Sequence, residues 1–195
     1  MTDERSRDPS VVPTQHHNPE PDTETRSVVL VLTGDGKGKS SSAFGTLLRG
    51  VARGWRCEVV QFIKSGDWRV GEEKVLTDIG VAWRSIGDGF SWDAEDLEVS
   101  KGLANDAWAV AREKLASGEV DVLLLDEITY PMNWGWIDTE EVVAAVRDRA
   151  PNTYVILTGR DAPAALVELA DTVSEVRNVK HAYDRGILAR RGFDY

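Results

Sequence analysis

A glycine-rich stretch between an apolar run and a helical pattern constrains this chain more than any other feature. Residues 33–40 read Thr-Gly-Asp-Gly-Lys-Gly-Lys-Ser, directly after the apolar run at residues 28–32. Residues 41–53 then place their apolar side chains on one helical face. Strand, glycine-rich loop, Gly-Lys-Ser and helix together predict a P-loop, which surrounds a phosphate with backbone amides at a helix N-terminus.

The end of the loop carries the side chains that a P-loop needs. Lys39 is expected to bond phosphate oxygens, and the hydroxyl of Ser40 is expected to ligate Mg²⁺. The stretch departs from the usual G-x-x-x-x-G-K-[ST] pattern at one position, because Thr33 stands where the first glycine is common. The alternative is a glycine-rich turn without a ligand, which the flanking strand and helix disfavour.

A second acidic element follows the most apolar strand that we expect. Residues 122–127 read Val-Leu-Leu-Leu-Asp-Glu, the Walker B form. In a P-loop protein such carboxylates face the magnesium ion, a hard cation that prefers oxygen ligands. Asp126 and Glu127 are therefore candidate ligands, although Glu127 could instead activate water as in an ATPase. A strand that simply ends in solvated acids is the remaining reading.

Strands and helices are expected to alternate along the rest of the chain. Expected strands cover residues 28–32, 57–63, 81–86, 120–125, 154–158 and 172–176; expected helices cover 41–53, 71–79, 94–117, 138–149 and 163–170. The residues between 128 and 137 are expected to form a loop. Continuous apolar strands predict a mostly parallel sheet with helices on both faces, an α/β fold of the P-loop NTPase (RecA-like) type. Ligands of such sheets bind at the carboxyl ends of the strands. The groups at these ends are the P-loop, residues 64–68, residues 87–93, Asp126-Glu127 and Gly159-Arg160.

Composition limits the kind of partner. The net charge of −10 over 195 residues argues against a nucleic-acid surface. The sequence has no apolar run long enough to span a membrane and no apolar signal core at its start, so we expect a cytoplasmic enzyme. Residues 1–26 are polar and without periodicity, and we expect them to be disordered or ordered only by a partner. Residues 27–195 then form the single folded domain.

Several further blocks, in a fixed order, resemble one known family. They are residues 33–45, 60–64, 71–72, 89–93, 124–130, 158–160, 169–171, 179–182 and 192–195, together with Trp68. Many NTPases share the P-loop, but the ordered blocks are similar to the P-loop-type corrinoid (cob(I)alamin) adenosyltransferases over residues 27–195. Departures are small: Asp35, Ser40 and Ile128 stand where asparagine, threonine and leucine are common.

The resemblance implies an activity. Enzymes of this family transfer the 5′-deoxyadenosyl group of ATP to the reduced cobalt of a corrinoid and release inorganic triphosphate, in adenosylcobalamin biosynthesis and corrinoid salvage. It also implies a homodimer, an electron-donating reductase as partner, and ATP bound in a reversed sense, with its γ-phosphate in the usual α place. No general base is needed, because cob(I)alamin is itself the nucleophile.

The same resemblance assigns roles to residues. Phosphate and nucleotide contacts are implied for Gly34, Asp35, Gly36, Lys37, Gly38, Lys39, Ser40 and Ser41. Ser40 and Glu127 would hold Mg²⁺, with Asp126 assisting or in a second shell. Arg160, at a strand end, is a candidate phosphate or nucleotide contact, with a plain surface arginine as the alternative.

Phe90 and Trp92 complete the predicted catalytic set with Lys39. They match the positions from which the family packs apolar side chains beneath the cobalt in place of its lower axial ligand. Without the resemblance, both would be read as core aromatics of a loop, as we expect Trp55, Trp83 and Trp108 to be core residues.

Other function classes make different products or need different parts. A P-loop ATPase that drives a motor would release ADP and phosphate rather than triphosphate. A non-catalytic corrinoid carrier would have no use for a P-loop. A small-molecule kinase is expected to carry a separate lid segment, which the sequence does not suggest.

Overall fold

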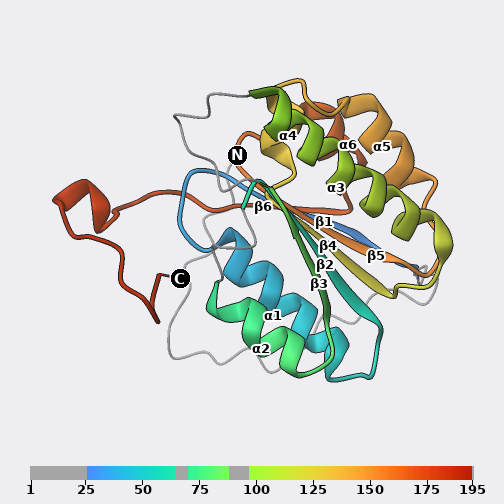
Figure 1. Cartoon of the computed structure of the whole chain (residues 1–195), viewed down its shortest axis with the longest axis horizontal. Helices are drawn as coiled ribbons and strands as arrows, with labels where there is room; N and C mark the ends of the chain where they lie inside the picture. Colours follow the sequence, from blue (N-terminus) through green and yellow to red (C-terminus); the bar gives the residue numbers. More distant parts are fainter. Residues whose placement is uncertain (1–25, 65–69, 88–96, 195) are drawn as a thin grey trace, which may run out of the picture.

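One parallel sheet organises the molecule. The computed structural model describes residues 26–64, 70–87 and 97–194. Six strands lie in the order β3-β2-β4-β5-β1-β6, and each described pairing is parallel (Figure 1). The strands are β1 (Val29–Thr33), β2 (Cys57–Phe62), β3 (Ala82–Ile86), β4 (Val122–Asp126), β5 (Tyr154–Thr158) and β6 (Thr172–Glu175). The predicted α/β fold with a parallel sheet is confirmed.

Helices cover both faces of this sheet. They are α1 (Lys39–Val51), α2 (Gly71–Asp78), α3 (Leu97–Ser117), α4 (Thr129–Asn133), α5 (Thr139–Arg147) and α6 (Ala164–Leu169), followed by the 3₁₀ turn η1 (Tyr183–Arg185). Helices α1 and α2 lie on one face, and α3, α5 and α6 lie on the other (Figure 1). None of the helices in the described ranges is both long and apolar enough to cross a membrane.

The two helical layers explain why the central strands are buried throughout. Successive side chains of a strand point to opposite faces, so a strand covered on both faces must bury all of them. Every residue of β2 and β4 is buried. Leu47 of α1 belongs to the cluster on one face with Leu124, and Trp108 of α3 belongs to the cluster on the other with Leu125.

Two expectations about aromatic segments are corrected. The segment that we expected to be a loop contains α4, with Pro131 in its first turn, where a missing N–H costs no intrahelical hydrogen bond. Trp108 is buried and Trp83 is half-buried, but Trp55 is 42% exposed, so it is not a core residue. Trp55 instead stacks on Tyr154, with 5.2 Å between the ring centroids.

The two ends of the domain differ. Of the predicted N-terminal tail, all but Arg26 lies outside the described residues. The start of β1 is fixed by side chains: the Val29 amide donates to Asp171 (2.7 Å), and Arg149 donates to the Ser27 carbonyl (3.0 Å). After β6, the chain continues as a C-terminal arm, residues 177–194, that extends away from the sheet (Figure 1).

Candidate functional site

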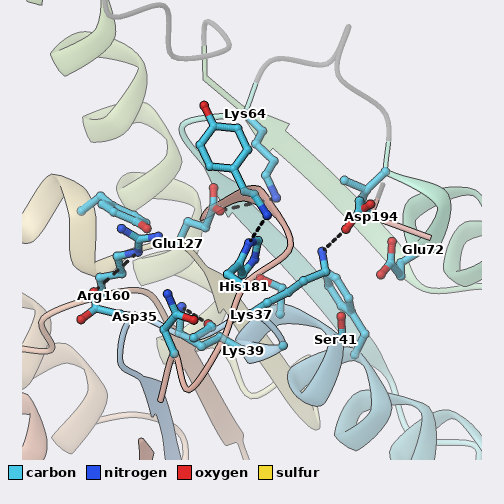
Figure 2. A pocket seen from close by; sticks show the side chains of 18 of the residues that line it. Asp35, Lys37, Lys39, Ser41, Lys64, Glu72, Glu127, Arg160, His181 and Asp194 are labelled. Carbon is cyan, nitrogen blue, oxygen red and sulfur yellow. Dashed lines mark hydrogen bonds and ion pairs between the residues drawn. The ribbon is translucent and has the colours of Figure 1, made fainter. Parts of the chain in front are cut away.

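Nine of the predicted site residues meet in one cavity at the carboxyl ends of the strands. Its volume is about 390 Å³. The P-loop, the end of β2, the start of α2, the ends of β4 and β5 and the C-terminal arm all contribute to its wall (Figure 2). The lining residues are Asp35, Gly36, Lys37, Gly38, Lys39, Ser40, Ser41, Phe44, Lys64, Val70, Glu72, Glu127, Tyr130, Arg160, Asn178, His181, Tyr183, Asp184 and Asp194.

The P-loop backbone needs its glycines. Gly34 and Gly38 have φ values of 96° and 122°, a region that residues with a side chain avoid. A Cβ atom on Gly34 would also lie 2.5 Å from the Val176 carbonyl oxygen. Helix α1 begins at Lys39, so Ser40 and Ser41 lie in its first turn, where amides have no intrahelical acceptor. Amides at this position of a helix can bind an anion in the way that we predicted.

One expected phosphate donor is engaged elsewhere. The Gly36 amide donates to the Val176 carbonyl at 2.7 Å, so the end of β6 holds the loop in this conformation. The ammonium of Lys39 donates to the carbonyls of Gly34 (2.7 Å) and Gly36 (2.9 Å). Burial, followed by the nearby Arg160, lowers the pKa of Lys39. A phosphate bound in the loop would replace the two carbonyls as the acceptor of Lys39. Its negative charge would stabilise the ammonium.

Carboxylates balance the other cations of the cavity. Lys37 lies 3.0 Å from Asp194 of the C-terminal arm, and Arg160 lies 4.0 Å from Asp35 (Figure 2). Arg160 therefore faces the P-loop from the end of β5. The Asp35 carboxylate stands beside this cation, where an incoming phosphate would compete with it.

Asp126 is a buried support rather than a wall of the cavity. Its side chain is fully buried, and its oxygens accept hydrogen bonds from Gln61 (2.8 Å) and Thr158 (2.7 Å). Thr158 also accepts a hydrogen bond from the Glu127 amide at 2.9 Å. This network ties the ends of β2, β4 and β5 together. The geometry favours the assisting role for Asp126 over direct contact with a metal.

Glu127 faces the cavity because the backbone turns sharply after β4. Its φ is 64°, uncommon for a residue with a side chain. Burial raises the pKa of Glu127 to about 7, although Lys64, with Nζ 3.5 Å from Oε1, acts in the opposite direction. The carboxylate of Glu127 and the hydroxyl of Ser40 line the same cavity. Both are oxygen ligands that suit Mg²⁺.

A cation at this position would need oxygens from the substrate. In the part of the chain that the structure describes, no group of three or more His, Cys, Asp and Glu side chains is arranged to hold a metal ion. Two protein oxygens with several phosphate oxygens and waters is the common arrangement of Mg²⁺ in phosphoryl sites. The donor set therefore fits a magnesium ion that arrives with a polyphosphate.

Ten residues that line the cavity had no predicted role, and two predicted residues, Gly34 and Asp126, do not line it. These ten are Phe44, Lys64, Val70, Glu72, Tyr130, Asn178, His181, Tyr183, Asp184 and Asp194. Lys64 had a signal, because it directly follows a buried strand. Phe90 and Trp92 lie outside the described residues, so their role stays a prediction.

The pKa of Glu127 predicts a pH dependence of stability in metal-free buffer. The folded-state pKa of about 7 lies above the ordinary value of 4.5, so folding favours the protonated form. The contribution of Glu127 is fully present below the ordinary pKa and is lost as the pH rises through about 7. We expect Glu127→Gln to become more stable relative to wild type from about pH 5 to about pH 8, by on the order of 2 kcal/mol. Urea unfolding in EDTA measures this; parallel pH curves for the two proteins would contradict it.

The chain is similar to one protein family and to several of its named members. A sequence model of the family described as ATP:corrinoid adenosyltransferase BtuR/CobO/CobP matches residues 25–195. The corrinoid adenosyltransferase of Escherichia coli (strain K12) is 43% identical over 156 residues, which cover 80% of this chain and 79% of that protein. The corrinoid adenosyltransferase CobA of Salmonella typhimurium is 39% identical over the same coverage. That of Pseudomonas aeruginosa is 38% identical over 158 residues, 80% of this chain and 77% of the relative.

Proposed function

This chain belongs to the ATP:corrinoid adenosyltransferase family, and we propose that ATP gives up its 5′-deoxyadenosyl group to a corrinoid in the P-loop cavity. The activity itself, adenosylation of corrinoids in cobalamin biosynthesis and salvage, is that of the family and of the relatives. One observation carries the assignment to the cavity. Lys37, Lys39, Ser40, Glu127 and Arg160, which lie far apart in the sequence, line the same space.

The reaction explains why the cavity is rich in cations. The electron pair of the reduced cobalt forms a bond to the 5′ carbon of ATP, and the bond from that carbon to the α-phosphate oxygen breaks. Its electron pair leaves with triphosphate, so negative charge grows on the leaving group. Donors fixed where this charge develops lower the barrier. We assign this role to Lys39, Lys37 and the amides of Ser40 and Ser41.

Binding of ATP requires two lysines of the P-loop to exchange their present partners for phosphate oxygens. Lys39 would leave the carbonyls of Gly34 and Gly36, and Lys37 would leave Asp194, so that both ammonium groups reach phosphate oxygens. Charge-assisted bonds to phosphate are stronger than those to neutral carbonyls, which favours the exchange at Lys39. The reversed direction of ATP stays part of the proposal.

Mg²⁺ is the proposed metal. Ser40 and Glu127 would hold it, and it would supply positive charge to the leaving triphosphate. Asp126, hydrogen-bonded to Gln61 and Thr158, would keep the end of β4 in place beside this position.

A homodimer, an electron-donating reductase and a cytoplasmic location also belong to the proposal. The C-terminal arm supports the dimer, since Val179, Leu188 and Phe193 are 93%, 76% and 86% exposed. A second copy of the chain would give these apolar side chains a surface to cover. The reductase is required by the chemistry, because only reduced cobalt is nucleophilic enough to attack ATP.

An anaerobic assay with ATP and chemically reduced cobalamin tests the activity. We expect the corrinoid spectrum to change to that of the alkylated form, with one inorganic triphosphate released per corrinoid. Release of ADP and phosphate at the rate of turnover would instead support the ATPase reading.

The aromatic prediction separates reduction from transfer. If Phe90 and Trp92 displace the lower ligand, Phe90→Ala and Trp92→Ala should slow the reaction that starts from cob(II)alamin with a weak biological reductant, by about tenfold or more. They should slow the reaction much less when cob(I)alamin is supplied ready-made. A packing role predicts equal loss in both assays and a lower melting temperature, since truncating a core aromatic costs about 3–5 kcal/mol. The ratio of the two rates, with a thermal melt, is the measurement.

A further inference from the structure

The backbone at the end of β2 is strained where it delivers Lys64 to the cavity. Ile63 has a φ of 72°, and the Lys64 amide donates to the Phe62 carbonyl at 2.8 Å. A hydrogen bond across three residues with a left-handed central residue is a γ-turn of the rare, strained kind. A β-branched side chain makes this conformation still less favourable. Such outliers persist where the surrounding structure imposes them, and they cluster at functional sites.

The neighbouring strand is built to hold this turn. Gly87 follows β3, which pairs with β2 up to Phe62 and Ile86. A Cβ atom on Gly87 would lie 2.3 Å from the carbonyl carbon and oxygen of Ile63. Only glycine allows the end of β3 to pack against the strained residue. The turn is therefore a supported feature of the sheet edge that faces the cavity.

The strain places a cation beside Glu127. The Lys64 ammonium lies 3.5 Å from a Glu127 oxygen, and the two side chains are 25% and 23% exposed. Figure 2 shows Lys64 and Glu127 together on one side of the cavity, with the P-loop residues Lys37 and Lys39 across from them. An ion pair between partly exposed groups contributes little stability, so this pair alone is a weak reason for the strained turn.

We propose that Lys64 is a further catalytic residue, whose ammonium contacts the phosphate oxygens of the leaving triphosphate. This inference rests on the proposed function. Triphosphate oxygens in the same cavity compete with the Glu127 carboxylate for the Lys64 ammonium, with or without the cation that accompanies ATP. The electron pair of the broken carbon–oxygen bond goes to the α-phosphate oxygen. Lys64 keeps its proton and donates hydrogen bonds to the anion. This contact strengthens as charge develops, which is the condition for catalysis.

Binding of inorganic triphosphate tests the contact without the transfer reaction. Lys64→Met, Lys64→Arg and the control Lys74→Met would be titrated with triphosphate by calorimetry, with Mg²⁺ and again in EDTA. Lys74 is a matched control, because it lies on α2 with its side chain 79% exposed and pairs with Asp78. We expect Lys64→Met to weaken triphosphate binding about tenfold or more in both buffers, and Lys64→Arg to retain part of the affinity. Lys74→Met should bind as wild type does.

Transfer from ready-made cob(I)alamin gives the second readout. We expect Lys64→Met to lower kcat/KM for ATP about a hundredfold, with Lys64→Arg between this variant and wild type. Unchanged triphosphate affinity in Lys64→Met would overturn the inference. A loss confined to the Mg²⁺ buffer would also overturn it, since Lys64 would then act only through Glu127.

Two further results have a different meaning: an inactive wild-type protein and a poorly folded Lys64→Met protein. A wild-type protein that fails to transfer the adenosyl group would overturn the proposed function, whatever the variants bind. If Lys64→Met melts far below wild type, the same titrations with Lys64→Gln decide the question, because the amide keeps a polar, uncharged group near Glu127 on a side chain one atom shorter. Wild-type affinity in a folded Lys64→Gln protein would overturn the inference.

Discussion

Replacing Lys39 by Ala is expected to lower kcat/KM for adenosyl transfer by about 30- to 1000-fold while the fold survives. The ammonium lies on the first turn of α1 and, within the described ranges, donates to two loop carbonyls. Loss of a charge-assisted contact to a developing anion typically costs on the order of 2–4 kcal/mol of transition-state stabilisation. The anaerobic transfer assay over a range of ATP concentrations measures the loss, and a thermal melt monitors the fold.

Lys101→Ala is the matched control for this substitution. Lys101 is exposed on α3, and it does not line the cavity, so its removal should leave transfer unchanged. Near-normal turnover of Lys39→Ala, with the control also normal, would remove the P-loop lysine from the mechanism. An equal loss in both variants would point to the change in net charge rather than to a phosphate contact.

The sheet and its P-loop could be predicted because their signals are local. An apolar run that is buried on both faces differs from its surroundings over a few residues, and the glycine-lysine-serine turn follows one of these runs directly. The signal of the Walker B strand is equally local. The two predicted metal ligands, Ser40 of the P-loop and Glu127 after this strand, line the same cavity. Parallel strands bring their carboxyl ends to one edge of the sheet, so clustering at that edge followed from the topology alone.

The finer parts of the site depend on contacts between distant segments. The residues around Asp126 in the sequence do not predict that Gln61 and Thr158 donate hydrogen bonds to its two oxygens. The pairing of Lys37 with Asp194 joins the P-loop to the last residues of the chain. Packing of the end of β6 on Gly36 likewise takes an amide that the loop pattern offers to phosphate. Such pairings are properties of the folded chain rather than of any window of sequence.

Local preference is misleading at the end of β2. Ile63 is a good strand residue with a β-branched side chain, so the sequence predicts that the strand continues through it. The structure ends β2 at Phe62 and places Ile63 in the left-handed region. Conflicts of this kind between local preference and the fold are expected at functional positions. The sequence therefore did not predict the strained turn that precedes Lys64.

A second large effect is expected at Gly159, which should not tolerate alanine. Its φ is 144°, outside the range that a residue with a side chain adopts easily. A Cβ atom there would lie 1.9 Å from Oγ1 of Thr129, a fully buried side chain that donates to the Arg160 carbonyl at 2.6 Å. Gly159→Ala must therefore strain the backbone and displace Thr129. We expect a loss of about 3–5 kcal/mol in the free energy of unfolding and a melting temperature lower by about 10 °C.

Gly102→Ala provides the matched control, and Thr129→Ala separates the two causes of the loss. Gly102 lies within α3 with open space around its Cα, so alanine there should stabilise the protein by about 0.5–1 kcal/mol through helix propensity. In the Gly159→Ala background, Thr129→Ala removes the oxygen at 1.9 Å but leaves the φ of 144° unchanged. Partial recovery of stability in the double variant is therefore expected. Urea unfolding of the four proteins measures each step. A Gly159→Ala protein as stable as wild type would mean that the turn into Arg160 relaxes freely, and that the position of Arg160 at the cavity is not fixed by this glycine.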